Sequence, residues 1–319
     1  MKARKNSKFL YYLRGFSLML YPKPLLRRRT LKRLKKAQSH PDYGYLMERV
    51  NYYNKLNGAQ LPDSAKELSQ QKYKEKNGGS VYFFDSYEFA RCFRRNLRWI
   101  IKGGDVTTIP EHPTFVKSRP IAGDNANSVV LKMDKVRHFF FVEDTIPFEK
   151  KMSKILFRGY VHGKPNRQDF IEKFADHPKC DARDTAPHST NPQKWRAENM
   201  SIAKHLDYRY IMALEGNDVA SNLKWVMSSN SIAVMPRPVY ETWFMEGKLI
   251  PNVHYIEIKP DYSDLIERIE YYDSHIDEAK EIIRNAHEYV KQFRNRRQEE
   301  LISLMVMEKY FRQTGQNIG

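Results

Sequence analysis

The sequence has little cysteine and lacks several short motifs that identify enzyme classes. Only Cys92 and Cys180 occur among 319 residues, which excludes a disulfide scaffold and a cysteine-rich zinc site and favours free thiols in a reducing compartment. The chain has no Walker loop, His-Glu-x-x-His, Gly-x-Ser-x-Gly or Gly-x-Gly-x-x-Gly motif. These absences disfavour P-loop hydrolases, zinc proteases, α/β-hydrolases and dinucleotide-dependent dehydrogenases.

Long hydrophobic runs are also missing. The apolar stretch at residues 9–20 is interrupted by Arg14 and is shorter than the ~20 residues that a membrane-spanning helix needs. No small-residue cleavage site follows it, so we expect no signal peptide. Residues 1–40 form a basic, aromatic segment with two interpretations that the sequence leaves open. Either this segment lies on an anionic membrane surface, or it packs on the first domain and exposes a solvated basic face.

Positive charge is what the chain has in excess. The net charge is +17 and the isoelectric point is about 9.6, so we expect an anionic partner: nucleic acid, a phosphorylated glycan or a membrane surface. Residues 1–41 hold 13 Lys or Arg and no Asp or Glu, which leaves +4 for the remainder. The basicity therefore belongs mainly to the N-terminus.

The length and composition predict two α/β domains. A chain of 319 residues with 41% hydrophobic residues can form two cores in domains of about 150 residues. We predict a first α/β domain at residues 41–150, a second at residues 151–275, and helices at residues 276–319. Within the first domain, the local pattern predicts a helix at 65–75, and a strand at 81–84 followed by a helix through Arg94.

The most regular part of the chain is the stretch from Tyr208 to Leu265. Apolar runs at 210–214, 231–235 and 254–258 predict buried strands, and the apolar spacing at 219–227 predicts a helix. Another helix is expected at 262–271. Strands that alternate with helices are typical of a parallel sheet covered by helices.

The turn before the predicted helix at 219–227 is the point of chemical interest. Gly216 allows a ligand to approach the backbone closely. A helix that begins there would point N–H groups and a partial positive charge at an anion, most often a phosphate. An ordinary strand-to-helix turn also accounts for a single glycine, so the flanking residues must decide.

Three pieces of this stretch resemble glycosyltransferase family 90 in their order and spacing. This family includes bacterial lipopolysaccharide-core glycosyltransferases and eukaryotic protein O-glucosyltransferases. The resemblance covers roughly residues 100–285. The pieces are Glu215-Gly216 with 221–224 and 231–234, then Glu241 and Trp243 with Leu249, Pro251 and His254-Tyr255, then 259–265.

The resemblance implies a GT-B fold, in which two Rossmann-like domains face a cleft and long C-terminal helices pack back on the first domain. It also implies an inverting enzyme that moves a hexose from a nucleotide diphosphate sugar, expected to be UDP-linked, to a lipopolysaccharide core sugar. The Asp-x-Asp triplet of metal-dependent GT-A enzymes is absent, so we expect no metal cofactor. Arg, Lys and helix N-termini would then meet the charge of the leaving group. A lipid-anchored acceptor suits a peripheral enzyme on the cytoplasmic face of the bacterial inner membrane.

By the same resemblance, the donor site lies in the second domain. Arg158 and Gly159 match the family's Arg-Gly strand end, and Arg167 matches an arginine at the next helix. Glu241 is assigned to the ribose hydroxyls as a hypothesis. The predicted donor-binding residues are Arg158, Gly159, Arg167, Gly216, Asn217, Ser221, Asn222, Lys224 and Glu241.

Asp105 is the predicted catalytic base. It follows two glycines and precedes a predicted strand at 114–116, as in the family segment that it resembles. Its carboxylate would deprotonate the acceptor hydroxyl as that oxygen attacks the anomeric carbon. An aspartate after glycines is also a common turn residue, and only the resemblance favours the base. On the acceptor side of the cleft we expect Lys117, Ser118 and Arg119.

Two other functions stay open. Protein O-glucosyltransferases are related, but they act in an oxidising lumen and use disulfides, which two cysteines do not favour. A non-enzymatic protein that binds nucleic acid or another anionic surface would account for the charge of +17. No RNA- or DNA-binding motif supports specific binding to nucleic acid.

Overall fold

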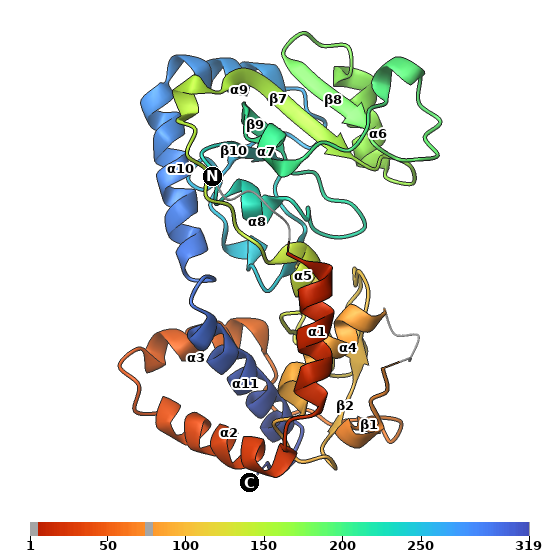
Figure 1. Cartoon of the computed structure of the whole chain (residues 1–319), viewed down its shortest axis with the longest axis vertical. Coiled ribbons are helices and arrows are strands. Elements are labelled where there is room, and N and C mark those ends of the chain that lie inside the picture. Colours follow the sequence, from red (N-terminus) through yellow and green to blue (C-terminus); the bar gives the residue numbers. More distant parts are fainter. Residues whose placement is uncertain (1–5, 74–78, 319) are drawn as a thin grey trace. The chain divides into compact units, whose positions relative to one another are not determined.

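The computed structural model describes residues 6–73 and 79–318, which form two compact units (Figure 1). Unit 1 comprises residues 138–239 and 246–292, and unit 2 comprises residues 6–137, 240–245 and 293–318. The units therefore interleave along the chain. The division into domains at residues 40, 150 and 275 stays a prediction.

Unit 1 is built on a five-stranded sheet with the strand order β12-β10-β9-β7-β8. Every neighbouring pair in it is parallel, which confirms the parallel sheet predicted from alternating strands and helices. The strands are β7 (Met152–Gly159), β8 (Cys180–Asp184), β9 (Tyr208–Met212), β10 (Ile232–Met235) and β12 (Ile256–Glu257).

Helices cover this sheet with their apolar faces. One core joins strand residues such as Ile155 and Val234 to Phe170, Leu265 and Ile282 of the helices. The helices of unit 1 are α6 (Pro165–Phe174), α7 (Ile202–His205), α8 (Leu223–Val226), α9 (Leu265–Ser274) and α10 (Ile276–Lys291), with short 3-10 turns at Phe148–Lys150, Gln193–Trp195 and Glu246–Lys248.

Unit 2 combines small sheets with long helices. Strands β3 (Ile101–Lys102), β4 (Thr114–Val116) and β6 (Ser128–Val130) form a parallel sheet in the order β3-β4-β6. Two antiparallel pairs join β1 (Lys66–Glu67) to β2 (Arg98–Trp99) and β5 (Ser118–Pro120) to β11 (Tyr240–Thr242). The helices are α1 (Lys8–Met19), α2 (Lys23–Ala37), α3 (Tyr43–Tyr53), α4 (Ser80–Ala90) and α11 (Arg296–Gln313), and α5 (Lys135–His138) follows at the boundary with unit 1.

Helix α11 lies in the core of unit 2, beside α3 (Figure 1). The ring of Tyr310 packs 4.3 Å from that of Phe115, and its hydroxyl donates to the carbonyl of Pro113 at 2.8 Å. Asn54, at the end of α3, donates from Nδ2 to the carbonyl of Val306 at 3.1 Å. Segments near both ends of the sequence thus share one core.

Three local predictions are wrong. Residues 81–84 lie inside helix α4, because a run of four apolar residues fits a buried helix as well as a strand. The helix predicted at 65–75 is instead β1 with a 3-10 turn at Leu68–Gln70, and its last two residues lie outside the described residues. The helix predicted at 219–227 is reduced to α8, which holds four residues.

Two further observations bear on the sequence predictions. Among the described residues, no helix is both long enough and apolar enough to cross a membrane. Cys92 and Cys180 are buried free thiols, and burial raises the pKa of Cys180 to about 12. Neither thiol has the exposure and lowered pKa of a reactive cysteine.

Candidate functional site

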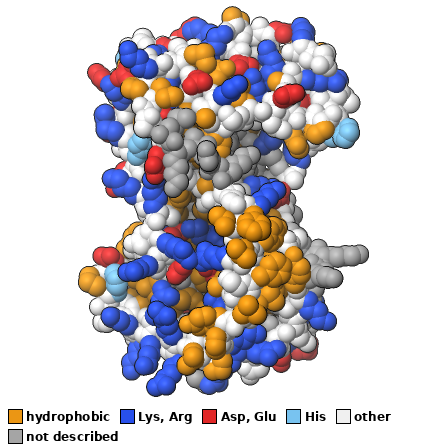
Figure 2. Space-filling model, in the orientation of Figure 1, with side chains coloured by type: hydrophobic (Ala, Val, Ile, Leu, Met, Phe, Trp, Pro, Cys, Tyr) orange, Lys and Arg blue, Asp and Glu red, His pale blue; other side chains and the backbone are white. Residues whose placement is uncertain are grey.

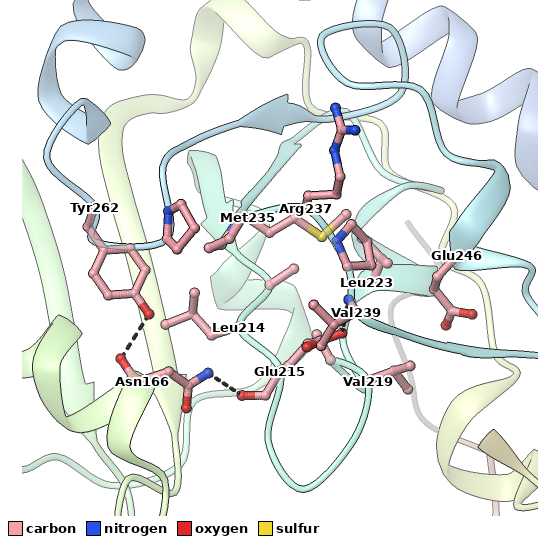
Figure 3. Close-up of a pocket in the computed structure, with 15 residues that line it drawn as sticks. Asn166, Leu214, Glu215, Val219, Leu223, Met235, Arg237, Val239, Glu246 and Tyr262 are labelled. Carbon is pink, nitrogen blue, oxygen red and sulfur yellow. Dashed lines mark hydrogen bonds between the residues drawn. The ribbon is translucent and has the colours of Figure 1, made fainter. Parts of the chain in front are cut away.

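A pocket lies at the carboxyl edge of the unit 1 sheet (Figure 3). Its volume is about 180 Å³, and residues that follow β9, β10 and β12 line it. Open parallel sheets bind ligands at this edge, and small-molecule sites are mostly apolar with a few polar groups. This pocket has that composition: Asn166, Ala213, Leu214, Glu215, Val219, Ala220, Leu223, Met235, Pro236, Arg237, Pro238, Val239, Glu246, Pro260 and Tyr262.

Arg167 holds one wall of the pocket in place. From α6 it donates to three backbone carbonyls: Nε to Glu215 at 3.0 Å, Nη2 to Leu214 at 2.8 Å and Nη1 to Tyr160 at 3.0 Å. Burial of the guanidinium lowers the pKa of Arg167. Three of the five N–H groups of the guanidinium are used in this way. Arg167 therefore positions the loops after β7 and β9.

Gly216 lies in close contact with that guanidinium. A Cβ at this position would lie 3.0 Å from Nη2 of Arg167, closer than ordinary van der Waals contact. The predicted helix N-terminus at Gly216 is wrong, because α8 begins only at Leu223. The residues between them form a loop, in which the Gly216 N–H donates to the carbonyl of Asp218 at 2.9 Å. The loop is also joined to the next strand, since the Val239 N–H donates to Oε1 of Glu215 at 3.1 Å (Figure 3).

Three more predicted donor residues lie in or next to this loop. Asn217 accepts a hydrogen bond from Lys164 through Oδ1, and Asn222 donates to the carbonyl of Met212 at 2.9 Å. Ser221 is exposed. Arg167, Gly159 and Gly216 are therefore brought together, whereas Asn217, Ser221 and Asn222 do not line the pocket.

Arg158 is engaged with a carboxylate. Its Nη2 lies 2.7 Å from both carboxylate oxygens of Asp181, and the Tyr208 hydroxyl donates to the same carboxylate at 2.6 Å. Burial opposes ionisation of Asp181, but the hydrogen bonds from Tyr208 and Arg158 prevail and lower its pKa. Arg158 does not line the pocket either.

Lys224 does not line the pocket but forms an ion pair with a residue that does. It is fully buried on α8, and its Nζ lies 2.8 Å from Oε1 of Glu246, which lines the pocket and is 1% exposed. This pair supplies a fixed charge distribution at the pocket edge. Arg237 is the contrast: it lines the pocket, its side chain is 72% exposed, and its pair with Glu257 at 2.9 Å is a surface pair of low energy.

A second cluster of charged side chains lies at the carboxyl edge of the three-stranded sheet in unit 2. Asp105 follows β3, Lys117 follows β4, and Asp134 follows β6. Lys117 is buried and forms an ion pair with Asp105. Arg137 reaches both carboxylates, with Nη2 3.5 Å from Asp105 and Nε 2.9 Å from Asp134. The parallel strands thus bring two carboxylates and two cationic side chains together.

The two acids differ in exposure. The side chain of Asp105 is 21% exposed, whereas that of Asp134 is 7% exposed. Burial raises the pKa of Asp134 to about 6, although Arg137 and Lys117 act in the opposite direction. At neutral pH, Asp105 is the more accessible carboxylate of this pair.

Arg119 and Glu241 form a buried ion pair elsewhere in unit 2. Nε of Arg119 lies 2.8 Å from Oε1 of Glu241, and the side chains are 0% and 2% exposed. The two residues face each other across β5 and β11. Glu241 therefore lies in unit 2, whereas the other predicted donor residues lie in unit 1, and its donor role stays a prediction. Ser118 is also buried, and its hydroxyl accepts from the N–H of Val106 at 3.1 Å, next to Asp105.

The sequence interpretation missed Asp134, Arg137 and Arg237. Asp134 adopts a φ of +54°, which a sequence does not reveal. Asp134 follows strand β6 in the same way that Asp105 follows β3. Carboxylates that follow successive parallel strands would have been a sufficient signal, because those strand ends share one edge.

The sequence is similar to those of known glycosyltransferases. The sequence model of the family described as Glycosyl transferase family 90 matches residues 128–308. The chain is 40% identical over 312 residues to O-glucosyltransferase LpsA of Dichelobacter nodosus, which covers 97% of this chain and 96% of that protein. Protein O-glucosyltransferase 2 of Danio rerio is 27% identical over 42% of this chain and 28% of its own length. Protein O-glucosyltransferase 1 of Rattus norvegicus is 28% identical over 45% and 38%.

Proposed function

Because the chain belongs to glycosyltransferase family 90 and is a glycosyltransferase, we propose that it transfers glucose from UDP-glucose to a sugar of the lipopolysaccharide core. The observation that carries the proposal is the 40% identity with an O-glucosyltransferase along almost the whole chain. The core acceptor follows from the bacterial branch of the family that the sequence resembles. The position of the pocket at the carboxyl edge of a parallel sheet supports a nucleotide sugar as the donor.

We further propose a GT-B arrangement, with unit 1 as the donor domain and unit 2 as the acceptor domain. In unit 1, the apolar pocket lining would accept the nucleobase. Arg167 and Gly216 would fix the loop that carries Glu215. The exposed side chain of Arg237 would exchange its surface pair with Glu257 for the diphosphate.

In the proposed reaction, Asp105 acts as the base. It takes the proton from an acceptor hydroxyl, whose oxygen forms a bond to the anomeric carbon while the bond from that carbon to the diphosphate oxygen breaks. Attack from the face opposite the leaving UDP inverts the configuration. Lys117 and Arg137 hold the Asp105 carboxylate in place. Lys and Arg, without a metal ion, would meet the charge on UDP.

The acceptor implies a location. Because lipopolysaccharide core is assembled on a lipid anchor, we propose a peripheral enzyme on the cytoplasmic face of the inner membrane. A protein acceptor is the alternative, and it rests on the eukaryotic relatives, which align with less than half of this chain.

Donor binding is tested by thermal shift with UDP, UDP-glucose, UDP-galactose and GDP-mannose, each with EDTA. We expect UDP and UDP-glucose to stabilise the protein, by about 2.7 kcal/mol at a concentration of 100 times Kd. Arg237→Gln should weaken this stabilisation, whereas Arg284→Gln, an exposed arginine on α10, should not. No shift with any nucleotide at millimolar concentration would overturn the proposed donor.

A further inference from the structure

Helix α1 is fixed to unit 2 by one face. The Tyr11 hydroxyl donates to Oδ1 of Asp85 at 2.8 Å and lies 3.1 Å from the carbonyl of Val81. Gly15 is buried so closely against α4 that a Cβ would lie 2.6 Å from the ring of Phe84. Helix α1 of the basic N-terminal segment is therefore packed on unit 2, and its remaining faces are held in a fixed orientation.

A second face of α1 carries apolar side chains into solvent. Phe9, Leu13, Phe16 and Leu20 are 74%, 56%, 48% and 87% exposed. Their spacing of four, three and four residues places them along one side of a helix. Phe16 lies at the edge of this stripe, since its ring also packs 5.0 Å from Phe84. Contiguous exposed apolar surface of this kind marks an interaction site.

Helix α2 places positive charge beside this stripe. Residues 6–41 contain no Asp or Glu, and Tyr21 and Leu25 are exposed where α1 meets α2. Figure 2 shows hydrophobic side chains gathered over α1 and Lys and Arg side chains over α2. The exposed basic residues of α2 are Arg28, Arg29, Lys32, Lys35 and Lys36.

We propose that α1 and α2 form a docking platform for an anionic lipid bilayer. The stripe of α1 enters the boundary between headgroups and acyl chains, and α2 lies against the anionic headgroups. Both features are needed for this choice of partner. Nucleic acid would leave the apolar stripe in water, and a second copy of the chain would bring two basic helices together. The platform is independent of donor and acceptor chemistry, so it is tested without nucleotide.

The first experiment is flotation of the full chain with vesicles of phosphatidylcholine alone or with 30% phosphatidylglycerol. We expect binding to the anionic vesicles only. Leu13→Ser/Leu20→Ser should lower the partition coefficient by about tenfold or more, and Arg28→Gln/Lys32→Gln by roughly 10- to 30-fold. The matched controls Met152→Ser/Ile250→Ser and Arg284→Gln/Lys291→Gln change exposed residues of unit 1 and should bind as the wild type does.

The second experiment measures insertion. A tryptophan introduced by Leu13→Trp should shift its emission to the blue and be quenched by brominated lipid, whereas one introduced by Ile250→Trp should not. Circular dichroism confirms that each variant is folded.

Three results would overturn the platform. One is equal binding to neutral and anionic vesicles, and another is full binding by the folded Leu13→Ser/Leu20→Ser variant. The third is binding to duplex DNA at 150 mM salt that is tighter than binding to anionic vesicles, which would assign the basic helix to nucleic acid.

Discussion

Asp105 is the residue on which the chemistry is expected to depend. Replacing it with Asn removes the base but keeps its size, so we expect kcat to fall by about 10²- to 10⁴-fold while the Kd for UDP-glucose stays unchanged. Transfer assays and calorimetric titration measure the two quantities. Asp124→Asn, an exposed aspartate of the same unit, serves as the control. A loss of donor affinity equal to the loss of rate would contradict a role as base.

Asp134 makes stability depend on pH in a predictable direction. Its pKa of about 6 in the folded protein exceeds its ordinary value of 3.8, so between these values the folded state binds more protons than the unfolded state. Stability contributed by this group is therefore full below about pH 4 and is lost as the pH rises through 6. We expect Asp134→Asn to gain up to about 2–3 kcal/mol relative to the wild type between pH 4 and pH 7. Urea unfolding of both proteins at pH 4 and pH 7 measures this. The same difference in free energy of unfolding between variant and wild type at both pH values would contradict the prediction.

At the scale of single elements, the loop after β9 is expected to depend on the close contact between Gly216 and Arg167. Gly216→Ala should displace the guanidinium of Arg167 from the Leu214 carbonyl, because the new Cβ would lie 3.0 Å from Nη2. We expect the Kd for UDP to rise by about tenfold, which corresponds to about 1.4 kcal/mol. Gly44→Ala, where a Cβ meets nothing within 4 Å, is the matched control. Unchanged UDP affinity in Gly216→Ala would show that the loop does not shape the donor site.

The pairing of β5 with β11 distinguishes two roles for Glu241. Glu241→Leu leaves Arg119 buried and without its carboxylate, which should cost about 3–5 kcal/mol of stability. The Arg119→Met/Glu241→Leu double variant should recover much of this loss. UDP affinity of the folded protein should not change. If Glu241→Leu keeps its melting temperature and loses UDP binding instead, the ribose role from the sequence is the correct one.

Elements of unit 1 were largely predictable, because their apolar runs alternate regularly with helical spacing. The strand predicted at 231–235 is β10, and the helix predicted at 262–271 is found as α9. Prediction failed where tertiary contacts decide. Residues 81–84 are helical because α4 is buried on more than one side. In the segment 219–227 only Leu223–Val226 are helical. Asn222 is the N-cap residue of this helix, but its side chain donates to the carbonyl of Met212 instead of capping the helix.

The residue types of the candidate site were predictable from the sequence, but the partners of these residues were less so. Asp105 and Lys117 were both named from the sequence, and the parallel strands bring them together. Arg158 and Glu241 were also named, but each has a buried or half-buried ionic partner distant in sequence, Asp181 and Arg119. Such pairings depend on strand register, which a single sequence does not specify.

At the scale of the whole molecule, we propose that unit 1 binds the donor, unit 2 supplies the base, and α1 and α2 dock on the bilayer. These assignments are separable by experiment. A variant of the α1 stripe should lose vesicle binding and keep transfer to a soluble, deacylated acceptor. An Asp105 variant should show the reverse.

The most direct test is the transfer of radiolabelled glucose from UDP-glucose to deacylated lipopolysaccharide core, with EDTA present. We expect label in the core oligosaccharide with inverted anomeric configuration, formed by the wild type and not by Asp105→Asn. No incorporation from any nucleotide sugar, or equal incorporation by Asp105→Asn, would contradict it.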